Sequence, residues 1–149
     1  ISKEARKRFK LEKIIWAITK KNPLKAESKT PISKKIKDCK KIIGLNSFIK
    51  VKFYENIIKS NKTIDLINYL KKNKNIEIFF LMGADNLISF HKWHKSELIS
   101  QKCNIIVFDR HGYKKNSLKS KTFKRLNNKT LTFVEFKKVN ISSSQLRKI

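Results

Sequence analysis

The chain has little of several residue types that mark well-known classes of protein. It has three glycines, two prolines and two cysteines in 149 residues. The glycines are too few and too scattered to form a phosphate-binding loop of the Walker type. Cys39 and Cys103 lie far apart, without the Cys-x-x-Cys spacing of a zinc site, and imply no disulfide framework. We expect both thiols to be reduced and buried, as in a cytoplasmic protein.

Long apolar runs are also missing. No stretch approaches the ~20 consecutive apolar residues of a membrane span, and the first residues lack the apolar core of a signal peptide. Hydrophobic residues nevertheless make up 40% of the chain, which is enough for the core of one domain. We therefore expect a single cytoplasmic domain over residues 1–149 with no membrane partner. Because the chain starts with Ile1, not methionine, we also expect it to be a fragment of a longer gene product.

Negative charge is scarce as well. The chain has 11 acidic and 37 basic residues, which gives a net charge of +26 and would suit an anionic partner such as RNA. However, only five of the basic residues are arginine, the side chain that reads base edges with paired hydrogen bonds. The lysines are spread over every segment, and Tyr and Phe fall mainly in apolar segments instead of interleaving with the cations. The composition therefore disfavours a non-catalytic RNA-binding protein, which stays open as an alternative.

Apolar segments alternate with helical patterns along the chain. Strands are predicted at residues 13–18, 48–53, 76–82, 104–108 and 131–136. Helices are predicted at residues 2–9, 32–43, from 63, near 93–100 and from 141. Residues 114–129 are polar and are expected to form a surface loop with a weak helix at 122–126. The alternation predicts an α/β fold in which helices cover both faces of a parallel sheet.

The most informative segment is the apolar run at 76–82, which stops at Gly83-Ala84-Asp85. That pattern is typical of a buried parallel strand whose carboxyl end opens into a ligand crevice. Glycine allows close approach of a ligand, and the carboxylate of Asp85 could bind a sugar hydroxyl. A tight turn with a helix-capping aspartate would explain the same residues equally well. Arg110 follows another buried strand and would face the same crevice if the two strands are neighbours.

Serines and an arginine near the end of the chain predict a phosphate site. Ser142, Ser143 and Ser144 precede helix-forming residues, so free backbone N–H groups and the positive end of a helix dipole would gather there. Arg147, about one turn into this helix, adds a guanidinium. An ordinary helix cap followed by a surface arginine is the alternative. Lys25, in a basic loop, could bind phosphate or could be a solvated lysine.

Other polar and aromatic residues give weaker signals. Trp93 follows a predicted strand and could stack on an aromatic ligand, or could simply cover the core. His91 and His94 are three residues apart, but no carboxylate completes a ligand set, so no metal site in the protein is predicted. Thr63 is placed to cap the helix that it opens.

Taken in order, these segments resemble the bacterial nicotinate-nucleotide adenylyltransferases of the nucleotidyltransferase superfamily, which has a Rossmann-like fold. Residues 141–147, Ile-Ser-Ser-Ser-Gln-Leu-Arg, are similar to that family's Ile-Ser-Ser-Thr-x-Ile-Arg motif, and residues 80–87 to its strand ending in Gly-x-Asp. Residues 90–93 match its aromatic segment. Residues 109–113 match its Arg-Pro-Gly-Tyr loop, with His111 in place of proline. Together the motifs cover essentially the whole chain.

The resemblance implies adenylyl transfer from ATP to nicotinate mononucleotide, with Mg²⁺ accompanying ATP. For ATP it implies contacts from Gly83, Asp85, Ser142, Ser143, Ser144 and Arg147, with Arg147 as the catalytic residue. For the mononucleotide it implies Trp93 on the pyridine ring and Thr63 at the nicotinate carboxylate, with further contacts from Asp85, Lys25 and Arg110. A related adenylyltransferase, such as the pantetheine-phosphate enzyme, is an alternative that Trp93 disfavours. The oligomeric state stays open.

One part of the family pattern is absent. The family's first strand and its His-x-Gly-His motif, which grips the ATP phosphates, would lie immediately before Ile1. That strand is central in the family's sheet. The strands at 13–18 and 76–82 are therefore each expected to have one unpaired edge.

Overall fold

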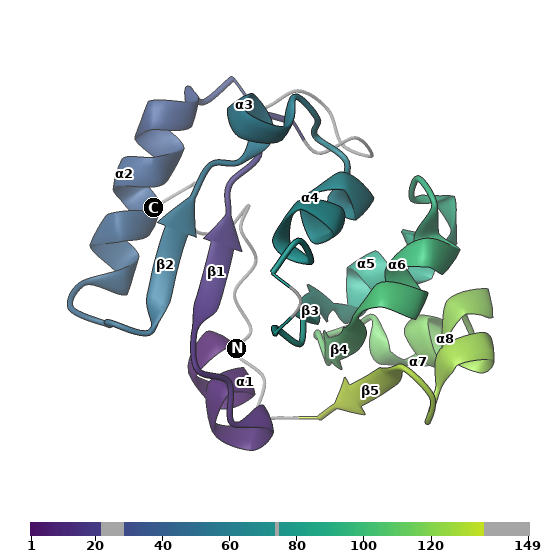
Figure 1. The fold of residues 1–149 in the computed structure, drawn as a ribbon. Helices are drawn as coiled ribbons and strands as arrows, with labels where there is room; N and C mark the ends of the chain where they lie inside the picture. The colour runs from purple at the N-terminus through teal and green to yellow at the C-terminus, as the bar shows by residue number, and fades with distance from the viewer. Residues whose placement is uncertain (22–28, 74, 136–149) are drawn as a thin grey trace. The chain divides into compact units, whose positions relative to one another are not determined.

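The computed structural model describes residues 1–21, 29–73 and 75–135 (Figure 1). The chain forms two compact units, Ile1–Tyr69 and Leu70–Ile149. The single domain expected over residues 1–149 stays a prediction. In the described part of the chain, no helix is both long enough and apolar enough to cross a bilayer.

The first unit contains a two-stranded parallel sheet. β1 (Ile14–Ala17) pairs with β2 (Ile49–Lys52), and α2 (Ile32–Ile43) lies between them in sequence and contacts β2 (Figure 1). Parallel neighbours require such a crossover. The other helices are α1 (Ser2–Phe9), α3 (Glu55–Ile58) and α4 (Thr63–Leu70), which ends at the boundary between the units.

The bounds of α2 follow from its flanking residues. Pro31 precedes the helix with φ −57°, which suits its fixed ring. Gly44 ends the helix with φ +56°, a conformation that strains any residue with a Cβ. The predicted helix at 32–43 is therefore confirmed.

The second unit contains a three-stranded parallel sheet in the order β3-β4-β5. Its strands are β3 (Phe79–Gly83), β4 (Asn104–Phe108) and β5 (Leu131–Val134). The β3–β4 connection consists of α5 (Ala84–Ser89), the 3₁₀ helix η1 (Phe90–Lys92) and α6 (Ser96–Lys102). The β4–β5 connection consists of α7 (Lys114–Leu118) and α8 (Lys121–Leu126). The α/β class and the parallel pairing are confirmed.

The core of the second unit lies around β4. Four consecutive residues of this strand are buried, and three of them, Ile105, Val107 and Phe108, have no exposed surface. A strand with neighbours on both sides and helices packed against it is expected to read as a continuous apolar run. From the helices, Leu87, Phe90 and Ile99 are also completely buried.

Two expectations about this unit need correction. The strand predicted at 76–82 begins later, at Phe79, although the carbonyl of Ile78 already accepts a hydrogen bond from the N–H of Asn104 at 2.9 Å. The surface loop predicted for 114–129 is wrong at 114–118, where α7 forms, whereas the weak helix predicted at 122–126 is confirmed as α8. Ser120 caps α8 by accepting a hydrogen bond from the Phe123 N–H at 3.1 Å, and Thr122 and Leu126, one helical turn apart, are buried.

Within the described residues every strand except β4 has an open edge, and β1 and β3 are the two for which the resemblance implies one. β1 pairs only with β2, and β3 only with β4, as the resemblance implies. β3 is also less buried than β4, since only Met82 among its five residues is fully buried. Each open edge presents backbone N–H and C=O groups on which a further strand could pair.

Candidate functional site

The carboxyl ends of β3 and β4 bring a carboxylate and a guanidinium together. Gly83 and Phe108 are opposite each other in the parallel register. Asp85 and Arg110 each come two residues later, so the segments that follow the two strands leave the sheet side by side. The Nη1 group of Arg110 donates a hydrogen bond to Oδ2 of Asp85 at 2.6 Å. Arg110 therefore faces the same place as Asp85, as the sequence predicts for neighbouring strands.

The Asp85 carboxylate is held in a confined position. Its side chain is 15% exposed, and its second oxygen, Oδ1, is buried with no hydrogen-bond partner among the described residues. A buried carboxylate oxygen in that state is unusual enough to need an explanation. Asp85 lies in the first turn of α5, but no side-chain hydrogen bond caps that helix. The helix-capping interpretation of Asp85 is therefore not supported.

Gly83 makes room for this carboxylate. A Cβ built on Gly83 would lie 2.5 Å from Oδ1 of Asp85 and 4.0 Å from Cδ of Arg110. The backbone at Gly83 is extended, with φ −81° and ψ 157°, so its torsion angles do not require glycine. The glycine is needed for the close approach of the Asp85 carboxylate. The approach of a ligand to Gly83 stays a prediction.

Trp93 follows η1 and packs on two aromatic side chains of the same unit. Its ring lies 5.9 Å from that of Phe80 at 70° and 5.4 Å from that of Phe90 at 52°. Both are edge-to-face or tilted geometries that favour aromatic pairs. These contacts support the interpretation that Trp93 covers the core. Its contact with a ligand stays a prediction.

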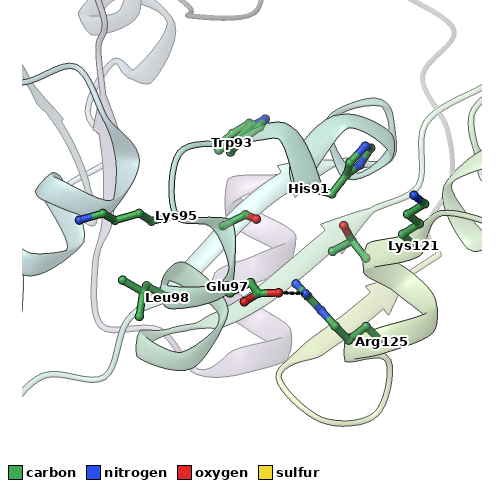
Figure 2. A pocket seen from close by; sticks show the side chains of 9 residues that line it. His91, Trp93, Lys95, Glu97, Leu98, Lys121 and Arg125 are labelled. Atoms are coloured by element: carbon green, nitrogen blue, oxygen red, sulfur yellow. Dashed lines mark hydrogen bonds and ion pairs between the residues drawn. The ribbon is translucent and has the colours of Figure 1, made fainter.

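A hollow of about 560 Å³ opens beside Trp93 (Figure 2). Cationic side chains line it: Lys95, Lys121 and Arg125. Glu97 also lines the hollow and forms an ion pair with Arg125, as the dashed line in Figure 2 shows. The hollow is thus open to solvent and positively charged, and its cations come from two separate stretches of the chain.

The sequence interpretation missed the part of this hollow that α8 contributes. It expected a weak helix at 122–126 but gave its residues no part in a site, whereas Thr122 lines the hollow and is only 1% exposed. A signal was available, because Ser120 followed by Thr122 and Leu126 has the spacing of a capped helix with one buried face. The high lysine content of the segment concealed it.

Thr63 lies in the first unit and begins α4 as predicted. The loop before the helix is held by another residue: the hydroxyl of Ser60 donates to Oδ2 of Asp65 at 2.5 Å and accepts from the Lys62 N–H at 3.1 Å. The other predicted site residues lie outside the described residues: Lys25, Ser142, Ser143, Ser144 and Arg147. Their roles stay predictions.

The cysteines do not have the properties of catalytic nucleophiles. Burial raises the pKa of Cys103 to about 11, so its thiol is protonated at neutral pH. Burial also raises the pKa of Cys39, but this side chain is only half-buried, so the expectation that both thiols are buried is wrong for Cys39. Within the described ranges, no three His, Cys, Asp or Glu side chains are grouped to hold a metal ion. The strand-end residues thus offer positioning and hydrogen bonding to a ligand.

Sequence comparisons cover the entire chain. Residues 1–149 match the family described as cytidylyltransferase-like. A protein of Pelagibacter ubique (strain HTCC1062) with the name "Probable nicotinate-nucleotide adenylyltransferase" is 64% identical over 149 residues, which are 100% of this chain and 83% of the relative. A protein of the same name from Rhizobium johnstonii is 30% identical over 123 residues, which are 81% of this chain and 61% of that relative.

Solved structures share the fold. The nicotinic acid mononucleotide adenylyltransferase of Plasmodium falciparum, complexed with NaAD, superposes with a TM-score of 0.68 at 21% identity over 93% of this chain and 69% of its own. The complex of the Plasmodium falciparum enzyme with APC gives a TM-score of 0.54 at 24% identity over 70% of this chain and 52% of its own. The fold, the full-length family match and the 64% identity together show that this chain belongs to the cytidylyltransferase-like family, among its nicotinate-nucleotide adenylyltransferases.

Proposed function

We propose that the protein transfers an adenylyl group from ATP to nicotinate mononucleotide, as a step in NAD biosynthesis. The observation that carries this proposal is the 64% identity, over the whole chain, to a relative named for that activity. The ligands in the titles of the two similar solved structures, NaAD and APC, are consistent with it. Both proposed substrates are water-soluble nucleotides, and we propose that the reaction takes place in the cytoplasm.

In this reaction a phosphate oxygen of the mononucleotide attacks the α-phosphorus of ATP. The bond from that phosphorus to the bridging β-phosphate oxygen breaks, and pyrophosphate leaves. No covalent bond to the protein is required, so the protein contributes by positioning the two nucleotides and by stabilising charge. The family takes a divalent cation with ATP, and we propose Mg²⁺. The Mg²⁺ ion would be bound by oxygens of the ATP triphosphate and would enter the site as part of the substrate.

The proposed roles follow the resemblance. Gly83 and Asp85 would meet a nucleotide ribose at the carboxyl end of β3, where open α/β sheets bind their ligands. Trp93 would stack on the pyridine ring and Thr63 would donate to the nicotinate carboxylate. The remaining contacts, all to phosphate groups, are proposed for Lys25, Ser142, Ser143, Ser144 and Arg147.

The complete gene product, incubated with ATP, nicotinate mononucleotide and Mg²⁺, should release pyrophosphate and nicotinate adenine dinucleotide in equal amounts. A chelator should stop both, because it removes the cation from ATP. Release of pyrophosphate only when 4′-phosphopantetheine replaces the mononucleotide would assign the protein to the related enzyme. Retention of RNA with a steep salt dependence, without turnover of either substrate, would favour the non-catalytic alternative.

The Trp93→Ala variant should raise KM for nicotinate mononucleotide by about three- to tenfold, since an aromatic contact contributes ~0.5–1.5 kcal/mol. The KM for ATP should change little. Loss of the contacts with Phe80 and Phe90 should also lower the free energy of unfolding, so Phe133→Ala serves as the matched control. Phe133 packs edge-on against Phe123 in the same unit, at 6.1 Å. The control should lower stability without changing either KM, whereas an effect of Trp93→Ala on ATP alone would reassign that residue.

A further inference from the structure

Arg110 is committed to one carboxylate in this structure. Its guanidinium donates to Oδ2 of Asp85 at 2.6 Å, and 41% of its side chain is exposed. Its guanidinium carbon also lies 6.0 Å from the centre of the Tyr113 ring, and the Tyr113 N–H donates to the Arg110 carbonyl at 3.0 Å. The arginine thus has both a carboxylate and an aromatic ring as neighbours, which limits the directions in which it can point.

The largely buried carboxylate of Asp85 has its hydrogen bond from Arg110, whereas the arginine side chain is also partly exposed to water. One of its oxygens, Oδ1, is buried without a hydrogen-bond partner among the described residues, so Oδ2 makes the contact that offsets burial of the carboxylate. Without the guanidinium, the carboxylate would be left near Gly83 with neither oxygen paired. Rotation of Asp85 toward solvent would then be favoured, because an unpaired carboxylate is poorly stabilised when buried.

The register of β3 against β4 places Asp85 and Arg110 next to each other. Gly83 and Phe108 are opposite each other, and Asp85 and Arg110 each follow two residues later. Two connections that leave neighbouring strands in the same direction thus bring their charged residues together. The contact ties the start of α5 to the loop after β4, at the end of the sheet where ligands of open α/β sheets bind.

From these contacts we propose that Arg110 is a positioning residue, which acts through Asp85 and not by contacting a phosphate itself. The guanidinium fixes the carboxylate at the end of β3 so that a nucleotide ribose meets it in one orientation. This inference rests on the proposed function, in which Asp85 binds a ribose. It replaces the phosphate contact that the sequence suggests for Arg110.

The test is a double-mutant cycle on the complete gene product with Arg110→Gln, Asp85→Ala and the double variant. Arg110→Gln should raise KM for one of the two nucleotides by about fivefold, the scale of coupling between contacting charged residues. Its kcat should change less than KM, because the arginine does not touch the reacting phosphates. In the Asp85→Ala background the same substitution should change KM by less than about twofold, since the oxygen that accepts from the guanidinium is gone.

Two further variants keep the test informative. Arg110→Lys keeps the charge but loses the planar guanidinium, and its KM should lie between those of the unaltered protein and Arg110→Gln. This variant can be measured even if Arg110→Gln folds poorly. Arg8→Gln is the matched control: Arg8 also pairs with a carboxylate, Glu4, and is 42% exposed, but it lies on α1, which carries none of the proposed site residues. Its KM values should equal those of the unaltered protein.

The outcomes separate this inference from the proposed function. Absence of adenylyl transfer in the unaltered protein would overturn the function itself. An active protein in which the two single effects multiply in the double variant would show that Arg110 acts independently of Asp85. A lower kcat in Arg110→Gln with unchanged KM would likewise refute positioning and return Arg110 to the phosphates.

Discussion

Gly83→Ala should lower kcat/KM roughly 10- to 100-fold, since the charge-assisted hydrogen bond proposed between the Asp85 carboxylate and a nucleotide ribose, worth ~1.5–3 kcal/mol, would be lost. The free energy of unfolding should change little. The added Cβ would lie 2.5 Å from Oδ1 of Asp85, a distance at which something must move. The backbone does not need to move, because φ −81° and ψ 157° suit alanine. The carboxylate moves instead, and it leaves Arg110 when it does so.

The free energy of unfolding should change little, because the Asp85–Arg110 ion pair that is lost has an arginine with 41% of its side chain exposed, and exposed pairs contribute at most about 1 kcal/mol. The clash is with the end of a short side chain, which can rotate toward solvent, and alanine reduces the entropy of the unfolded chain by ~0.4–1 kcal/mol relative to glycine. The expected signature is therefore weakened catalysis at an unchanged melting temperature. Steady-state kinetics for both substrates and a thermal melt would measure it.

Gly44→Ala is the matched control for this experiment. Gly44 has φ +56°, and no atom lies within 4 Å of the position that its Cβ would take. Alanine there is strained but does not clash, and should cost about 1–3 kcal/mol of stability without changing kcat/KM. If Gly83→Ala also lost stability and kept its activity, the close approach would be structural, and Asp85 would have no part in binding.

Most of the fold could be predicted from the sequence, because the apolar runs and the residues that flank the helices indicate the same element boundaries. The run of β4 is apolar throughout and buried throughout, and Pro31 and Gly44 bound α2. The prediction failed at 114–118, where a surface loop was expected and α7 forms, while the helix expected at 122–126 is present as α8. In α8 the helical signal is carried by a few residues, Ser120, Thr122 and Leu126, and the average polarity of the segment weakens it.

The sequence located the candidate site but not its internal pairing. Gly83, Asp85 and Arg110 were all identifiable from their positions after apolar strands, because parallel strands end at the same edge of a sheet. What spacing alone could not supply was the register of β3 against β4, which decides that Asp85 and Arg110 meet. For that reason an arginine suited to phosphate is better explained as the partner of a carboxylate.

Arg147→Ala should lower kcat/KM by at least about tenfold, since a charge-assisted contact to phosphate contributes ~1.5–3 kcal/mol. In the proposed reaction, negative charge builds up on the leaving pyrophosphate as its bond to the α-phosphorus breaks. A guanidinium on the triphosphate would stabilise that charge more strongly in the transition state than in the bound substrate. The loss should therefore appear mainly in kcat, with a smaller change in KM for ATP.

Two variants show whether the effect belongs to this side chain. Arg147→Lys keeps the charge without the paired N–H donors, and should recover only part of the loss. Lys148→Gln removes a neighbouring positive charge from a chain whose net charge is +26, and should change kcat/KM little if general attraction for nucleotides is unimportant. Equal losses in Arg147→Ala and Lys148→Gln would point to long-range attraction, and unchanged kinetics in Arg147→Ala would remove that residue from the site.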